Sequence, residues 1–84
     1  MASSIFDETH RRMTALLVSV RRGAGVTQAE LARRVGRSQS LISLVERNQR
    51  RVDVIEFVAL CRALDQDPEQ MFERLVQFDE AAQS

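Results

Sequence analysis

The sequence is poor in the residues that build metal sites, disulfides and catalytic pairs. Its 84 residues include one cysteine, Cys61, and one histidine, His10. A single cysteine cannot form an internal disulfide, and one histidine with one thiol is too few for a zinc site. Nor can a nucleophile–base pair be assembled from these residues. We therefore expect no metal, no cofactor and no enzyme activity, in a protein of the reducing cytoplasm.

Lysine is absent, so all twelve basic side chains are arginines, and they face twelve acidic residues for a formal net charge of zero. No apolar run approaches the roughly 20 residues of a membrane-spanning helix. The N-terminal residues also lack the basic start and apolar stretch of a signal peptide. These absences predict a protein without a membrane segment. A neutral total also argues against DNA as a partner, because DNA-binding domains usually carry a basic surplus.

The charges are segregated along the chain, which reverses that last argument. Residues 1–32 carry a net charge of +1, and residues 33–51 carry +5 from six arginines against one acid. Residues 52–84 carry −6 from two arginines against eight acids. Guanidinium groups suit bidentate contacts with phosphate or guanine. The middle of the chain is therefore suited to DNA, and the acidic C-terminal third to a different surface.

Apolar spacing and helix-ending residues indicate helices along the whole chain. A 3.6-residue stripe predicts a first helix over about residues 7–22, which the glycines of 23–25 end. Thr27 and Glu30 fit a capping box, in which each side chain satisfies a free backbone N–H at a helix start. The sequence therefore predicts a second helix over residues 28–35.

A third helix is predicted to follow the second within a few residues. Gly36 ends the second helix, and Ser38 is suited to cap a third helix that runs to Glu46 or Arg47. Asn48 then closes the third helix, because asparagine tolerates the left-handed backbone region. Two helices of about eight residues joined by a glycine-containing turn are typical of a helix-turn-helix.

Two more helices are predicted in the acidic third of the chain. Asp53 and Glu56 fit a second capping box, for a fourth helix that runs to Leu64. Asp67 and Pro68 fit the start of a fifth, because proline is favoured in the first helical position. Cys61 lies at a core spacing with Val54, Val58 and Leu64, so we expect it to be a small buried hydrophobe.

Residues 16–75 resemble the Cro and phage-repressor type of helix-turn-helix domain, also called the xenobiotic-response-element (XRE) family. The resemblance rests on Gly25-Val-Thr-Gln-Ala-Glu-Leu-Ala-Arg-Arg-Val-Gly36, followed by Ser38-Gln-Ser-Leu-Ile-Ser-Leu-Val-Glu-Arg-Asn48. Cys61-Arg-Ala-Leu64 and a last helix that begins at Asp-Pro follow in the same order. It implies an all-α fold: a compact five-helix, lambda-repressor-like domain with the helix-turn-helix at its second and third helices. The domain is expected over residues 9–78, with an N-terminal arm at 1–8 and a C-terminal tail at 79–84.

The resemblance also implies which residues touch DNA, with the third helix in the major groove. The expected base contacts are Gln39, Ser40 and Ser43, which share one arc of that helix. The expected backbone contacts are Thr27, Gln28, Arg37, Ser38, Arg47, Asn48, Arg50 and Arg51. The side chain of Gln28 is expected to span a phosphate and Gln39.

Three residues are assigned no DNA contact, and a fourth has several alternative roles. His10 is expected to be a plain surface or helix-edge residue, and Arg33 and Arg34 lie away from the DNA-proximal start of their helix. Leu44 replaces the polar or basic residue common in the family. A thymine methyl group, the following loop and a protein interface remain three alternatives for it.

These features predict a sequence-specific, double-stranded DNA-binding regulator of transcription, of prokaryotic or phage type. It would act in the cytoplasm, at the nucleoid, as a homodimer on a palindromic operator. The dimer surface is expected to come from the last helix, from the N-terminal arm with Ile5 and Phe6, or from a partner protein. On the last helix the expected interface is Met71, Phe72, Leu75, Val76 and Phe78. The alternative is a protein-interaction module, such as an antitoxin or a subunit of a hetero-oligomeric regulator, whose acidic C-terminal third docks a basic partner.

Overall fold

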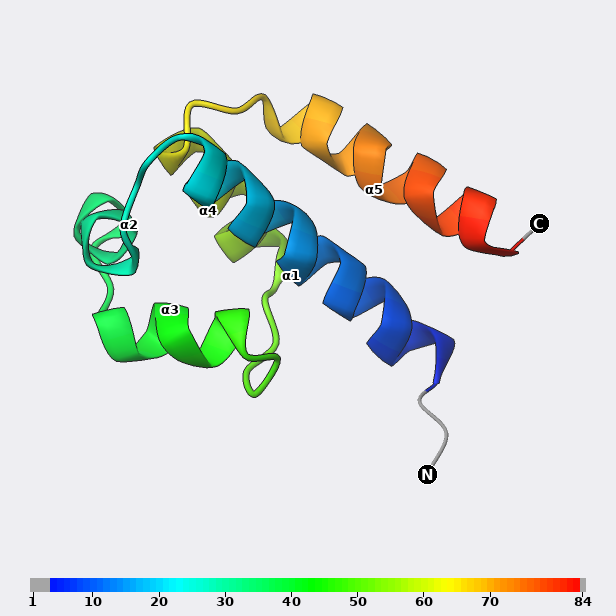
Figure 1. The fold of residues 1–84 in the computed structure, drawn as a ribbon, viewed down its shortest axis with the longest axis horizontal. Coiled ribbons are helices and arrows are strands. Elements are labelled where there is room, and N and C mark those ends of the chain that lie inside the picture. The colour runs from blue at the N-terminus through cyan, green and yellow to red at the C-terminus, as the bar shows by residue number, and fades with distance from the viewer. Residues whose placement is uncertain (1–3, 84) are drawn as a thin grey trace.

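The computed structural model describes the backbone of residues 4–83 and the side chains of residue 4 and residues 6–77. Within that range the chain forms five helices and no strand (Figure 1), which confirms the predicted fold class. The helices are α1 (Ile5–Gly23), α2 (Gln28–Val35), α3 (Gln39–Glu46), α4 (Val54–Ala63) and α5 (Pro68–Gln83). Helices α1 and α5 thus include residues assigned from the sequence to the arm and the tail. No described helix is long and apolar enough to cross a membrane.

The predicted caps set most of the helix boundaries. The Ser38 hydroxyl accepts a hydrogen bond from the backbone N–H of Leu41 at 3.1 Å, which fixes the start of α3. Asp53 and Glu56 form the complete capping box at the start of α4. At the other ends, Gly36 closes α2 in the left-handed region, with φ of 69°.

The helices enclose a single apolar core to which all five contribute. Its buried members are Met13, Leu17, Leu31, Ala32, Ile42, Phe57, Leu60, Cys61, Leu64 and Met71. Cys61 is fully buried, as predicted, and burial raises the pKa of its thiol to about 11. Val54 departs from the predicted core spacing, because the first turn of α4 is left uncovered and its side chain is 75% exposed.

The helices are arranged so that the start of α1 and the end of α5 lie away from α2 and α3. Helices α1 and α5 run side by side in opposite directions, and they bring the start of α1 and the end of α5 to one end of the molecule (Figure 1). Helices α2 and α3 pack together at the other end, with α3 on the opposite side of α1 from α5. The exposed face of α3 and that of α5 are therefore separate surfaces.

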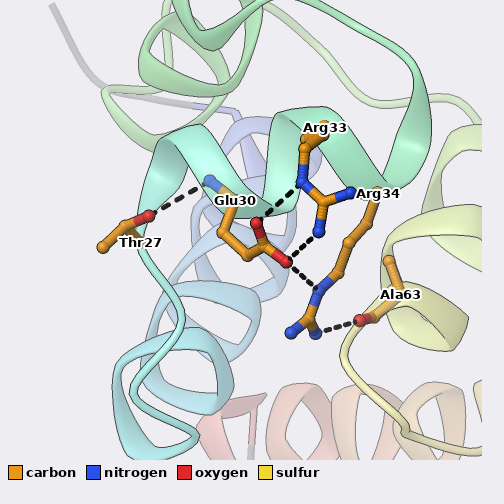
Figure 2. A network of polar contacts seen from close by, with 5 residues as sticks. All are labelled: Thr27, Glu30, Arg33, Arg34 and Ala63. Atoms are coloured by element: carbon orange, nitrogen blue, oxygen red, sulfur yellow. Dashed lines mark hydrogen bonds and ion pairs between the residues drawn. The ribbon is translucent and has the colours of Figure 1, made fainter.

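Helix α2 is tied to α4 by an ion-pair cluster centred on Glu30 (Figure 2). The Glu30 carboxylate accepts hydrogen bonds from Arg33 at 2.5 and 2.9 Å and from Arg34 at 3.1 Å, and Arg34 Nη1 also donates to the Ala63 carbonyl at 2.9 Å. These guanidinium groups lower the pKa of Glu30 to about 2. Half of the predicted capping box forms, since the Thr27 hydroxyl accepts from the Glu30 N–H. The Glu30 carboxylate binds the two arginines and does not complete the capping box.

Candidate nucleic-acid interface

The turn between α2 and α3 is short and tightly bonded. Gly36 adopts the left-handed conformation that α2 needs to end, and the backbone N–H of Arg37 donates to the Ala32 carbonyl at 3.0 Å. Ser38 begins the next cap at once. Because three residues join the helices, the direction in which α3 leaves α2 is set by local backbone geometry.

Helix α3 has one buried face and one open face. Ile42 and Val45 are buried at 2% and 5% exposure and anchor the helix to the domain. Gln39 and Ser40 are exposed on the first turn, and Ser43 is half-buried. These three residues, which are predicted to contact bases, line a shallow hollow of about 410 Å³ together with three neighbouring residues. We call it the reading hollow; it is lined by Gln28, Gln39, Ser40, Ser43, Leu44 and Arg47.

The side chain of Gln28 is held in a different way from the one expected. Its Nε2 donates to Glu46 Oε1 at 2.8 Å, so in the free protein its hydrogen bond goes to the end of α3 rather than to Gln39. Glu46 in turn binds Arg21 through two bonds, Nε to Oε2 at 2.6 Å and Nη2 to Oε1 at 2.9 Å. Arg21 also donates to the Val26 carbonyl at 2.7 Å. One buried ion pair therefore joins α1, the start of α2 and the end of α3.

The chain leaves α3 through Asn48, into residues 47–53, which we call the phosphate loop after the contacts predicted for it. Asn48 has φ of 60°, which confirms the predicted left-handed residue, and the Gln49 N–H donates back to the Leu44 carbonyl at 2.9 Å. Arg47 is exposed on the reading side, where its Nε donates to the Ser43 carbonyl at 3.4 Å. The loop thus begins beside the reading hollow.

Two of the predicted phosphate contacts lie against the same acidic side chain, Glu56. Arg50 Nη1 donates to Glu56 Oε1 at 2.6 Å, and Arg37 Nη2 lies 3.8 Å from Glu56 Oε2. Chiefly because of the Arg50 hydrogen bond, the pKa of Glu56 is lowered to about 2. Arg50 and Arg37 therefore have to exchange a carboxylate for a phosphate to contact DNA as the sequence predicts.

His10 makes a contact with a distant part of the chain that the sequence did not predict. Its Nε2 accepts a hydrogen bond of 3.0 Å from the backbone N–H of Val52, which lies 42 residues further along the chain. One turn earlier on α1, Asp7 Oδ1 lies 3.4 Å from Arg51 Nη1. Two side chains at the start of α1 thus contact the phosphate loop, one at its backbone and one at a side chain.

The five residues predicted for a dimer interface divide into several groups. Met71 is 1% exposed and belongs to the core, so its assignment to an interface is corrected. Leu75 is half-buried against that core. Phe72 and Val76 are 58% and 37% exposed on the outer side of α5. Phe78 lies outside the described side chains.

Sequence reasoning missed the buried Arg21–Glu46 pair. A signal was present, since Arg21 continues the apolar stripe of Met13 and Leu17 at four-residue intervals. An arginine at such a position is buried only when an acceptor is supplied from elsewhere. Its partner Glu46 is 25 residues away and carries no local mark of that role.

Fold and site together define a helix-turn-helix protein: two short helices meet at a glycine turn, and the second presents polar side chains from an anchored backbone. Comparison with known proteins agrees. The helix-turn-helix domain family matches residues 12–75. No curated protein compared with the chain is significantly similar to it in sequence.

Solved structures similar to this chain include an XRE-family like protein from Pseudomonas syringae pv. tomato str. DC3000. It is 40% identical, with a TM-score of 0.84, over 88% of this chain and 90% of that one. The restriction-modification controller protein C.AhdI from Aeromonas hydrophila is 31% identical, with a TM-score of 0.68, over 74% and 94%. The controller protein C.Esp1396I, as a tetramer in complex with its natural 35 base-pair operator, shares the fold at 22% identity and a TM-score of 0.77, over 84% and 93%.

The chain belongs to the helix-turn-helix domain family, and it is a DNA-binding regulator of the XRE type. That family consists of DNA-binding regulators rather than enzymes.

Proposed function

We propose that this protein regulates transcription by binding a palindromic operator as a homodimer, with α3 in the major groove. The observation that carries the proposal is the reading hollow, where the three expected base-contacting side chains lie together on the open face of an anchored helix. Helix-turn-helix domains place the N-terminal residues of the second helix against base edges. The protein would act in the cytoplasm, at the nucleoid.

The reading hollow offers both polar and apolar contacts to bases. Gln39, exposed on the first turn, matches the amide that reads adenine through two hydrogen bonds. Ser40 and Ser43 supply hydroxyl groups that bind either a base or a phosphate. Leu44 is half-buried in the same hollow, which favours contact with a thymine methyl group among its three alternatives.

The phosphate contacts are proposed around this hollow. Arg47 is exposed at its edge, and Arg51 is 67% exposed on the phosphate loop. The remaining proposed contacts are Thr27 and Ser38, which are exposed at helix starts, with Gln28, Arg37, Asn48 and Arg50. The acidic helix α5 lies on the opposite side of α1 from α3, so its charges are kept away from DNA (Figure 1).

A homodimer is proposed because one domain offers few base contacts. Three or four contacts give too little discrimination to find one site in a genome, whereas two half-sites about 34–36 Å apart double the number read. The exposed side chains of Phe72 and Val76 on α5 supply an apolar surface outside the reading face. We place the dimer contact there.

Gln39→Ala is expected to weaken binding to a selected operator by about 1–3 kcal/mol, because one bidentate base contact is lost. The operator is first selected from a random DNA pool, and the affinities are then compared by fluorescence anisotropy. Gln70→Ala is the matched control, since Gln70 is exposed on α5 away from the reading hollow. Equal affinities for the Gln39 and Gln70 variants would remove Gln39 from base reading.

Arg47→Ala is expected to weaken binding to all duplexes alike and to reduce the slope of log K against log salt by about one unit. The reason is that a phosphate contact releases a counterion but carries no base information. Titrations at four salt concentrations, on operator and on scrambled DNA, measure both effects. Arg62→Ala, at the end of α4, is the control and keeps the parent slope; a loss confined to the operator would contradict a phosphate role for Arg47.

A further inference from the structure

The phosphate loop is held from two sides. Arg50 ties it to α4, through Glu56 at 2.6 Å, and the same guanidinium donates to the Arg51 carbonyl at 2.7 Å. From the other side, α1 supplies His10 to the Val52 N–H and Asp7 to the Arg51 guanidinium. Three consecutive loop residues thus each have a contact that fixes them, and two of these contacts come from one turn of α1.

His10 binds a backbone N–H of the phosphate loop, so its contact bears on the conformation of the loop. The hydrogen bond of the Val52 N–H is part-buried, and its acceptor comes from α1 rather than from the loop. If His10 stops accepting, this donor loses its partner, and the adjoining peptide of Arg51 is no longer fixed relative to α1. A loop released in this way has to be ordered again when DNA binds, which lowers the affinity.

We propose that His10, assisted by Asp7, is a positioning residue for operator binding: it holds the phosphate loop in its DNA-binding conformation while neutral and releases it when protonated. This inference rests on the proposed function. His10 itself does not need to touch DNA. It acts through Val52 and Arg51, so its effect differs from that of a residue that binds phosphate.

The surroundings of His10 favour the neutral ring. A protonated imidazole donates from both nitrogens and cannot accept from Val52. The described charged groups that face the ring are Arg51 from the loop and Asp7 from α1, while α5 contributes the apolar Leu75 to the same hollow. Burial, and then Arg51, lower the pKa of His10 below its ordinary 6.5, and Asp7 partly opposes them.

The direction of the pH effect follows from that lowered pKa. Folding with the loop clamped favours the unprotonated ring, so the clamp is complete above pH 6.5 and is lost as the pH falls through the lower, folded value. His10 is the single histidine of the chain. A change in affinity between pH 7.5 and 5.5 can therefore be assigned by substituting one side chain.

The experiment measures operator affinity at pH 7.5 and 5.5 for the parent, His10→Gln and His10→Leu. Glutamine retains an acceptor and does not titrate, whereas leucine retains bulk without an acceptor. We expect the parent to lose affinity at pH 5.5 by less than about tenfold, because the pKa of His10 lies below 6.5, and His10→Leu to be about tenfold weaker at both pH values. His10→Gln should bind like the parent at pH 7.5 and lose little at pH 5.5.

The salt dependence separates positioning from phosphate contact. His10→Leu should keep the parent slope of log K against log salt, because all phosphate contacts still form in the complex. Arg51→Ala should reduce that slope by about one unit. If His10→Leu fails to fold, the positioning role of His10 is tested by comparing the parent with His10→Gln across pH. Hydrogen exchange of the Val52 amide is a second readout.

Two results would overturn the proposal: a parent pH response that persists in His10→Gln, or an unchanged affinity in a folded His10→Leu variant. Either result would leave the proposed function standing if Arg51→Ala still weakens binding. A parent that binds no duplex selected from a random pool would instead remove the proposed function, and with it the role of the clamp.

Discussion

Replacing Glu46 with alanine is expected to lower the free energy of unfolding by about 3–5 kcal/mol, because it leaves a buried guanidinium without its carboxylate. The side chains of Arg21 and Glu46 are 9% and 11% exposed, and two short hydrogen bonds join them. A domain of this size is stable by roughly 5–15 kcal/mol, so the loss is a large part of the total. Urea unfolding followed by circular dichroism measures it.

The less buried Glu30 provides a matched control. It binds the two arginines Arg33 and Arg34, but its side chain is 33% exposed, so water replaces the carboxylate when it is removed. Glu30→Ala should therefore cost clearly less than Glu46→Ala. A double variant, Arg21→Met with Glu46→Leu, should recover part of the loss, since no buried charge remains. If Glu46→Ala unfolds at the same urea concentration as Glu30→Ala, the buried pair does not stabilise the domain.

Loss of Glu46 also has a functional consequence that the control does not share. Gln28, at the edge of the reading hollow, donates its hydrogen bond to Glu46. In a Glu46 variant that still folds, this amide is free to rotate, and the hollow loses a fixed wall. Stability and operator recognition are coupled at this residue because the same carboxylate serves the core and the binding face.

The helices could be predicted closely because each boundary is marked by a residue with a local physical role. Gly36 and Asn48 supply left-handed conformations, and Ser38 and Asp53 satisfy backbone N–H groups within three residues of themselves. Such effects depend on near neighbours in the chain, so the sequence contains them directly. The open face of α3 follows in the same way from helical periodicity.

The connections between helices could not be predicted, because their partners are distant in sequence. Arg21 meets Glu46 across 25 residues and His10 meets Val52 across 42, and neither pair has a motif. The expected pairing of Gln28 with Gln39 also missed Glu46 as a competing acceptor. Periodicity assigns a residue to a face but does not say what covers it.

Residues on α5 show that the same limit holds for apolar side chains. Met71 and Phe72 are adjacent on one helix, and the sequence placed both at an interface, yet Met71 is 1% exposed and Phe72 is 58% exposed. The core reaches one side of α5 and leaves the other side open. This division narrows the predicted dimer surface to the residues that remain exposed.

Phe72→Asp is therefore expected to convert the proposed dimer to a monomer while the domain stays folded. A two-fold axis sets the same patch of each subunit against its copy, so each Phe72 would be replaced by a charge that faces its equivalent or the acidic residues of α5. The side chain is 58% exposed in one chain, so folding does not depend on it. Sedimentation equilibrium measures the association, and thermal unfolding checks the fold.

Ile55→Asp is the matched control for this variant. Ile55 is 77% exposed on the first turn of α4, so the substitution adds the same charge at another open apolar site. We expect Ile55→Asp to remain dimeric. If Ile55→Asp dissociates and Phe72→Asp does not, the interface lies on α4 instead. If neither variant changes the mass, the dimer contact involves neither exposed side chain.

The effect of Phe72→Asp on DNA binding should exceed that of any single DNA-contacting residue. In a dimer, binding of one half-site presents the second domain to the other half-site at a high effective concentration, which raises affinity by about 10²–10⁴ over one domain. A monomer loses this factor, although its reading hollow is intact. We therefore expect Phe72→Asp to bind the full operator at least about a hundredfold more weakly, yet to bind an isolated half-site like the parent. Equal losses on both DNAs would place Phe72 at the DNA rather than between subunits.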